Sequence, residues 1–287
     1  MKRFSRTMES HIIDRQSFLG FFCSNSMIKM VDEFPSFNIE GIKVPRVLIG
    51  INPFLGGSHF SKARSKYFRR IFGKVSAISD IIVKATEFGV TGIFTPASQK
   101  ISKTLIETEE RTGIDMTVVG TTCYTFNISK MANELDLLSD MGAKICLLHG
   151  NMVDDLLDPP NRSIKGAEEM LQLIRDKDMI PGIACHDARA MLFAKEKGYD
   201  SKIYATPVNK IGFWMSQEGL TLKIIKGIDE PLIALKPFAS GRMQPEEGLE
   251  FTLSTPGVTA VAIGVSNYEE VIQDFTLAKE LLHGRHL

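Results

Sequence analysis

The sequence has no excess of either charge. Its 34 lysine and arginine residues are balanced by 34 aspartate and glutamate residues, and the isoelectric point is about 7.0. A neutral chain exerts no general electrostatic attraction on nucleic acid or on an anionic membrane. We therefore expect a small-molecule substrate, and neither a nucleic-acid partner nor a membrane partner.

Long apolar runs and paired cysteines are also missing. No run of about 18 apolar residues exists that could span a bilayer, and the N-terminal stretch 1–16 is too polar for a signal peptide. The four cysteines (Cys23, Cys123, Cys146 and Cys185) are widely spaced and form no C-x-x-C pair. These absences exclude a disulfide framework and a zinc knuckle, and they predict a soluble protein of the reducing cytoplasm. The sequence does not indicate an oligomeric state.

What the chain does contain is a series of short apolar runs separated by helical patterns. The eight runs cover residues 47–52, 92–96, 116–122, 144–149, 181–186, 202–207, 231–236 and 258–264. Their apolar character is continuous rather than alternating, as in parallel strands that are buried on both faces. Several of the intervening helical patterns end at a glycine, the residue that commonly follows a helix C-terminus: Gly89, Gly113, Gly142 and Gly198.

Eight such units without a linker predict a single (β/α)8 TIM barrel over residues 46–287. An open doubly wound sheet is the alternative, but no G-x-G-x-x-G fingerprint follows the first run. Residues 1–45 form an N-terminal extension, and stretch 37–45 predicts a small β-hairpin that closes the bottom of the barrel.

In this fold the chemistry lies at the C-terminal ends of the strands. Three ionisable residues end predicted strands and are the candidate catalytic residues: His149, His186 and Lys236. Side chains alternate between the two faces of a strand. If both histidines point into the barrel mouth, Cys146 and Cys185 face the helices and are ordinary buried cysteines.

The two histidines, on adjacent strands, can hold one small ion. Zinc accepts histidine, cysteine and carboxylate ligands, so the candidate ligands are His149, His186, Cys123, Asp187 and His59. No short motif such as H-x-H or H-E-x-x-H supports this set. Histidines that only bond neighbouring polar groups, and a metal-free acid–base pair, are the alternatives.

An inward lysine in an apolar setting has a further use. Lys236 can have a depressed pKa and form a Schiff base; pairing with a nearby acid and binding an anionic substrate are the competing interpretations. The loops after the last two strands occupy the place where barrels often bind phosphate. Their candidate cofactor-binding residues are Ser240, Gly241, Arg242, Gly264, Ser266 and Asn267.

The last third of the chain resembles the aldo/keto reductases. The stretches that carry the resemblance are 231–243, 245–251 and 255–271, together with the hairpin and first strand at 37–54. Stretch 144–151, KICLLHGN, is similar to the fourth strand of that family, which ends in the histidine of a catalytic tetrad. The resemblance implies a TIM barrel, and His149 matches the tetrad histidine.

The other requirements of that family are not met. The tetrad adds Asp and Tyr after the second strand and Lys after the third, whereas this chain has Thr95-Pro96-Ala97-Ser98 and Thr121-Thr122-Cys123 there. The pair that would hold the nicotinamide is replaced by His186-Asp187, and the adenine-side asparagine by Asp274. The resemblance to the family, read with these losses, implies that NAD(P) is an unlikely cofactor.

The sequence therefore predicts an enzyme on an aldo/keto reductase-like barrel with a rebuilt active site. We expect metal-assisted hydrolysis or lyase-type chemistry on a small oxygenated substrate, centred on His149 and His186, with zinc as the metal. One alternative is an NAD(P)-dependent oxidoreductase of the aldo/keto reductase type with an unusual proton donor such as Tyr124. Another is a barrel that binds a small molecule without catalysis.

Overall fold

Eight parallel strands close into a barrel in the computed structural model, which describes residues 33–122 and 128–284. In chain order the barrel strands are β3 (Val47–Gly50), β4 (Gly92–Pro96), β5 (Thr117–Thr121), β6 (Ile145–Leu148), β9 (Ile180–Ala184), β10 (Tyr204–Pro207), β11 (Leu232–Leu235) and β12 (Ala260–Gly264). Each overlaps one of the eight predicted runs. The predicted TIM barrel is confirmed.

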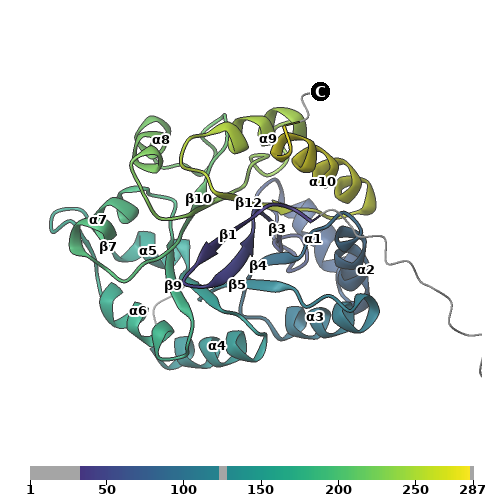
Figure 1. Ribbon diagram of the computed structural model, residues 1–287, viewed down its shortest axis with the longest axis horizontal. Coiled ribbons are helices and arrows are strands. Elements are labelled where there is room, and N and C mark those ends of the chain that lie inside the picture. The colour runs from purple at the N-terminus through teal and green to yellow at the C-terminus, as the bar shows by residue number, and fades with distance from the viewer. Residues whose placement is uncertain (1–32, 123–127, 285–287) are drawn as a thin grey trace, which may run out of the picture. The chain divides into compact units, whose positions relative to one another are not determined.

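Helices surround the barrel as an outer ring (Figure 1). They are α1 (Lys62–Ile71), α2 (Val75–Thr86), α3 (Gln99–Thr112), α4 (Ile128–Asp140), α5 (Gly150–Leu156), α6 (Ala167–Arg175), α7 (Arg189–Lys197), α8 (Glu218–Lys226), α9 (Pro245–Ser254) and α10 (Tyr268–Leu282). A two-stranded ribbon of β7 (Leu157–Asp158) and β8 (Ser163–Ile164) follows α5. Gly113 and Gly198 cap α3 and α7 in the left-handed conformation, as their positions in the sequence predicted.

The first and last strands join to complete the ring. Strands β12 and β3 pair in parallel from Val261↔Val47 to Gly264↔Gly50. A Cβ atom on Gly50 would lie 3.3 Å from the backbone nitrogen of Gly264, so the two backbones approach closely where the barrel opens into its mouth. Glycine at this point leaves room for a ligand next to the backbone.

Alternation along the strands separates two cores. Ile145 and Leu147 of β6 belong to the cluster inside the barrel, whereas Cys146 belongs to the larger cluster between barrel and helices. In the same way Ala184 of β9 faces the interior and Cys185 the helices. The predicted parity is confirmed, and burial raises the pKa of both thiols far above the ordinary value, so neither is a reactive cysteine.

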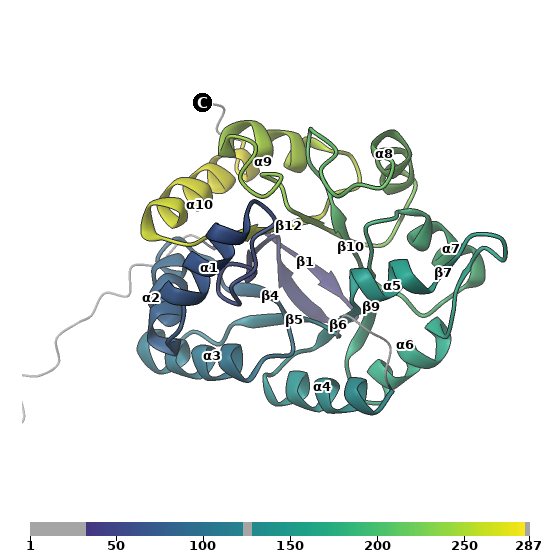
Figure 2. The ribbon, with the colours of Figure 1, turned by 180° about the vertical axis from the view of Figure 1, so that it is seen from behind.

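A β-hairpin covers the end of the barrel opposite the mouth (Figures 1 and 2). It consists of β1 (Ser36–Ile39) and β2 (Ile42–Pro45), and its turn residues Glu40 and Gly41 both have positive φ, as a two-residue type I′ turn requires. Ile39 and Val44 are buried and join the interior cluster. Arg175 of α6 holds the turn by donating two hydrogen bonds to the Glu40 carboxylate.

The hairpin therefore closes the bottom of the barrel, as the sequence suggested. Whether residues 1–45 form one unit distinct from residues 46–287 stays a prediction, because residues 1–32 lie outside the described part. Within residues 33–122 and 128–284, no helix combines the length and apolar character needed to cross a membrane.

The hairpin of β1 and β2 is expected to contribute measurably to folding stability. Replacing Ile39 by alanine removes buried methylene groups at the barrel bottom, and we expect the free energy of unfolding in urea to fall by about 2–4 kcal/mol. Ile106, which is 55% exposed on α3, is the matched control, and Ile106→Ala should change stability by less than about 0.5 kcal/mol. Equal effects of the two substitutions would show that the hairpin does not close the core.

Candidate active site

A cavity of about 490 Å³ opens at the C-terminal ends of the barrel strands. Strand ends contribute Gly50, Pro96, Thr121, Ala184, Leu235 and Gly264 to its wall. A second, outer cavity of about 390 Å³ adjoins it and shares His186 and Trp214 with it. The volume of the first cavity is in the range of small-molecule sites, and its position is where TIM barrels carry their chemistry.

His186 is fixed by a carboxylate that the sequence did not reveal as its partner. The ring nitrogen Nδ1 lies 2.7 Å from Oδ2 of Asp154. Asp154 also accepts the backbone N–H groups of His186 and Asp187, at 3.0 and 3.2 Å. Because a carboxylate can only accept, Nδ1 carries a proton, and Nε2 of the neutral ring presents a lone pair to the cavity.

Lys236 lies next to that lone pair. Its Nζ is 3.5 Å from Nε2 of His186 and lies over the ring of Trp214, 4.8 Å from the centroid. Burial lowers the pKa of Lys236 to about 8, although the charge of Asp154 acts in the opposite direction. Among the described residues no carboxylate forms an ion pair with Lys236. The lysine is therefore not a partner in a structural salt bridge.

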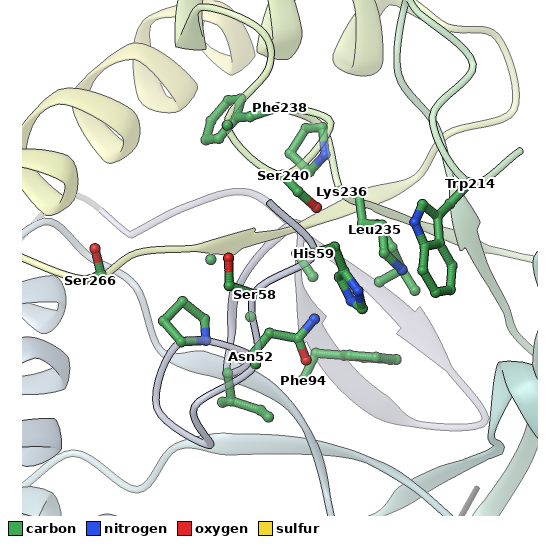
Figure 3. A pocket seen from close by; sticks show the side chains of 18 of the residues that line it. Asn52, Ser58, His59, Phe94, Trp214, Leu235, Lys236, Phe238, Ser240 and Ser266 are labelled. Carbon is green, nitrogen blue, oxygen red and sulfur yellow. The ribbon is translucent and has the colours of Figure 1, made fainter. Parts of the chain in front are cut away.

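Aromatic and imidazole rings surround the lysine. The centroid of the Trp214 ring lies 4.6 Å from that of His59 and 4.8 Å from that of His186. Figure 3 shows Lys236 between His59 and Trp214. Trp214 and the two histidines thus form an aromatic wall of the cavity, and the Lys236 amine lies against it.

The backbone around this wall is strained. Seven described residues other than glycine have a positive φ, and four of them lie here: Trp214, Lys236, Ala239 and Ser240. Such conformations cost roughly 1–3 kcal/mol each and persist only where the surroundings impose them. Their concentration beside Lys236 supports the assignment of this region as functional.

The contacts of His149 match the alternative in which the histidine bonds neighbouring polar groups. It is the N-cap of α5, and its Nδ1 accepts the backbone N–H of Asn151 at 3.2 Å. Its own backbone N–H donates to Thr122 Oγ1 at 3.0 Å. Burial, followed by the charges of His186 and Lys236, lowers the pKa of His149 to about 4. At neutral pH it is therefore an uncharged capping residue at the edge of the cavity.

The two histidines lie close together, as predicted, but they are in contact through packing and not through a shared metal-ligand cluster. A Cβ atom on Gly150 would lie 3.1 Å from Cε1 of His186, so the His186 ring packs directly on the backbone that follows His149. Asp187 does not point to this place, since it forms an ion pair with Arg189 at 2.6 Å. His59 is engaged with Trp214, and Cys123 lies outside the described residues.

The structure consequently gives the zinc hypothesis no support. Within the described ranges no three His, Cys, Asp or Glu side chains converge on a point that could hold a metal ion. Three of the side chains predicted as ligands have other partners: Asp187 pairs with Arg189, Nδ1 of His149 caps α5, and His59 packs against Trp214.

In the predicted anion-binding loops, several backbone N–H groups already donate to acceptors within the protein. The backbone N–H groups of Gly241 and Arg242 both donate to the carbonyl of Phe238, at 2.9 and 3.1 Å. The N–H of Ser266 donates to Glu270 Oε2 at 2.6 Å, and Asn267 is the N-cap of α10. Ser240, Gly241, Gly264 and Ser266 do line the cavity. The N–H groups of Gly241, Arg242 and Ser266 are thus bonded within the fold and are not free to bind a phosphate.

Two residues that shape this region, Asp154 and Trp214, were not among the predicted site residues. Asp154 lies five residues after His149 on a short helix, where an exposed acid and a buried partner have the same appearance in a sequence. Trp214 lies in the loop after β10, and its left-handed backbone (φ 62°) turns the ring toward the cavity. Neither position carries a local motif. An acid within two turns of a strand-end histidine is the one signal that could have marked Asp154.

Comparison with known proteins identifies the fold. A proposed aldo-keto reductase from Pseudomonas aeruginosa is similar over 88% of this chain and 98% of its own, with 14% identity and a TM-score of 0.64. An aldo-keto reductase from Bacillus halodurans aligns over 89% and 96%, with 11% identity and a TM-score of 0.54. Another, from a deep-sea metagenome library, aligns over 88% and 95%, with 11% identity and a TM-score of 0.56.

This chain has the TIM-barrel fold of these aldo-keto reductases. The resemblance that the sequence suggested is thus confirmed for the fold. No model of a known protein family matches the sequence, and no curated protein sequence is significantly similar to it.

The residues of this cavity do not fit the dinucleotide that the fold family implies. A dinucleotide phosphate needs free donors, whereas the Glu270 carboxylate takes the N–H and the hydroxyl of Ser266. The adenine-side position carries Asp274, a second acid. His186 and Asp187, at the place of the nicotinamide-binding pair, are committed to Asp154 and Arg189. That NAD(P) is not the cofactor stays a prediction, now supported by specific contacts.

The burial of the His149 ring, which caps α5, makes stability depend on pH. Its folded-state pKa of about 4 lies below the ordinary value of 6.5, so the unfolded chain binds the extra proton first as the pH falls. Stability is fully present above pH 6.5 and declines toward pH 4. We expect His149→Asn, which keeps a good N-cap, to remove about 1–2 kcal/mol of the stability lost between pH 7.5 and pH 5, measured by urea unfolding at both values. A variant with the same pH dependence as the parent would contradict this role.

Proposed function

We propose that this chain is an enzyme that forms an imine between the amine of Lys236 and a small aldehyde or ketone, with His186 as the acid–base group. The observation that carries the proposal is one juxtaposition. Lys236 Nζ lies 3.5 Å from His186 Nε2, and His186 is held by Asp154 through a contact of 2.7 Å. The reaction class is that of a lyase or isomerase acting next to a carbonyl group.

The chemistry follows from the protonation states of the two groups. His186 Nε2 accepts a proton from the Lys236 ammonium, and the Asp154 carboxylate stabilises the resulting imidazolium. The neutral amine adds to the carbonyl carbon, and the imidazolium gives its proton to the oxygen, which forms a carbinolamine. His186 then takes a proton from the nitrogen and gives it to the hydroxyl group, which leaves as water. The products of this step are the protonated imine and one water molecule.

The imine then activates the neighbouring carbon. Protonation of its nitrogen draws electrons from the adjacent bonds, so His186 can remove a proton from that carbon, or a carbon–carbon bond to it can break. Hydrolysis of the imine restores the lysine. The aromatic wall of Trp214 excludes water from one side of Lys236, and the lowered pKa of about 8 keeps an appreciable fraction of the amine neutral near physiological pH.

This proposal replaces the metal-assisted reaction expected from the sequence, while it retains the lyase-type chemistry and the small oxygenated substrate. The size of the cavity, about 490 Å³, suits a small molecule. The absence of nucleic-acid and membrane partners, and a cytoplasmic location, stay predictions.

Reductive trapping tests the lysine directly. Incubation with a panel of three- to six-carbon aldehydes and ketones in the presence of cyanoborohydride should add the reduced carbonyl compound to Lys236, detected by peptide mass spectrometry. Because the neutral amine is the nucleophile, labelling should rise as the pH passes through about 8 and then level off.

An exposed lysine gives the internal control. Lys62, which is exposed at the start of α1 and, among the described residues, has no histidine beside its amine to accept a proton, should label slowly. Labelling that is equal at Lys62 and Lys236, or that persists at the same rate in Lys236→Arg, would contradict the proposal.

Asp154 is expected to act as a positioning residue. Asp154→Asn removes the negative charge that orients His186 and stabilises its protonated form, and the rate of trapping at Lys236 should fall by at least about tenfold. The pH at which labelling levels off should move only slightly, because Lys236 itself is retained. The matched control is Asp155→Asn, a neighbouring exposed acid on α5. Unchanged trapping in Asp154→Asn would remove His186 from the mechanism.

A reductase is the second candidate, favoured by the similarity of the fold to aldo-keto reductases. Titration with NADPH discriminates between the two, with the fluorescence of Trp214 as the readout, since this sole tryptophan lines the cavity. We expect no saturable quenching below millimolar concentration. Saturable binding in the micromolar range would favour the reductase.

A further inference from the structure

The cavity extends away from Lys236 into an arm that none of the steps above uses. Arg64, Ser266, Glu270 and Asp274 line this acidic arm, which lies at the end of β12 and along the first turns of α10. In the view of Figure 3, Ser266 lies on the far side of the cavity from Trp214 and Lys236. A ligand attached to the lysine at one end could therefore reach this arm with its other end.

One of the two acids in the arm is fully engaged. Glu270 Oε2 accepts the N–H of Ser266 at 2.6 Å and its hydroxyl at 2.9 Å. The other oxygen lies 3.9 Å from Nη2 of Arg64. The charge of Glu270 is thus balanced by one arginine and by the donors that precede helix α10.

The other acid has no such balance. Asp274 lies one helical turn after Glu270, its residue is 3% exposed, and its Oδ1 has no hydrogen-bond partner among the described residues. An unmade hydrogen bond at a buried polar atom costs roughly 1–3 kcal/mol. Burial, together with the charges of Glu270 and Glu246, raises the pKa of this carboxyl to about 7. Asp274 is a buried acceptor beside an open cavity, with a partner missing.

We propose that the acidic arm binds a primary ammonium group of the substrate, with Asp274 as the main acceptor. An ammonium supplies three donors and the positive charge that Asp274 lacks. A phosphate or carboxylate would meet the unbalanced Asp274, and the N–H and hydroxyl of Ser266 already donate to Glu270. The proposal rests on the proposed function for the opposite end of the ligand, and the two together describe the substrate as a small aminocarbonyl compound.

Simple probes test the arm without any imine chemistry. In Lys236→Met, which cannot form an imine, binding of hexylamine, hexanol and hexanoate is measured by Trp214 fluorescence and by thermal shift. Hexylamine is expected to bind at least about tenfold more tightly than the other two, a difference of about 1.4 kcal/mol. Asp274→Asn in the same background should abolish this preference, whereas Glu269→Gln, at an exposed acid in the first turn of the same helix, should retain it.

The outcomes separate the two proposals. Equal binding of hexylamine and hexanol, or tighter binding of hexanoate, overturns the ammonium site, and this comparison does not depend on the folding of any Asp274 variant. A preference that survives in Asp274→Asn removes Asp274 from it. If hexylamine is preferred but no carbonyl compound is trapped at Lys236, the ammonium site stands and the imine mechanism fails.

Discussion

The arrangement of the candidate site depends on a single carboxylate. Asp154 accepts the Nδ1 proton of His186 and the two backbone N–H groups at the end of β9, and it thereby ties helix α5 to the neighbouring strand. This contact determines which nitrogen of His186 faces the cavity, and hence that Lys236 meets a lone pair rather than a second donor. The half-buried Asp154 carboxylate and its three donors also form a polar network whose members are satisfied together.

Barrel closure supplies the other half of the arrangement. Strands β6, β9 and β11 are brought around one mouth, so that residues nearly ninety positions apart, from His149 to Lys236, border the same cavity. The rigid strands fix the Cα positions, whereas the strained loops after β10 and β11 aim Trp214 and Lys236 inward. The scaffold resembles that of the aldo-keto reductases, but the side chains at the strand ends differ from that family, and function resides in those side chains rather than in the fold.

The fold was largely predictable from the sequence because its signals are local. Continuous apolar runs, helix-ending glycines and a hairpin turn each act within a few residues, and strand parity then placed Cys146 and Cys185 away from the mouth. The site was less predictable because its partners are chosen in three dimensions. Nothing in the sequence distinguishes Asp154, which holds His186, from the adjacent Asp155. Nor does the sequence show that Asp187 forms an ion pair with Arg189. His149, identified correctly as a residue of the mouth, acts as a helix cap.

The central claim is that Lys236 is an amine tuned for attack on a carbonyl group. The most direct measurement is an NMR titration of its side-chain Nζ or Cε signal, assigned by comparison with Lys236→Arg. The account predicts a midpoint near pH 8, because burial beside His186 disfavours the charged form. A midpoint near 10.5, the value of an ordinary lysine, would contradict it.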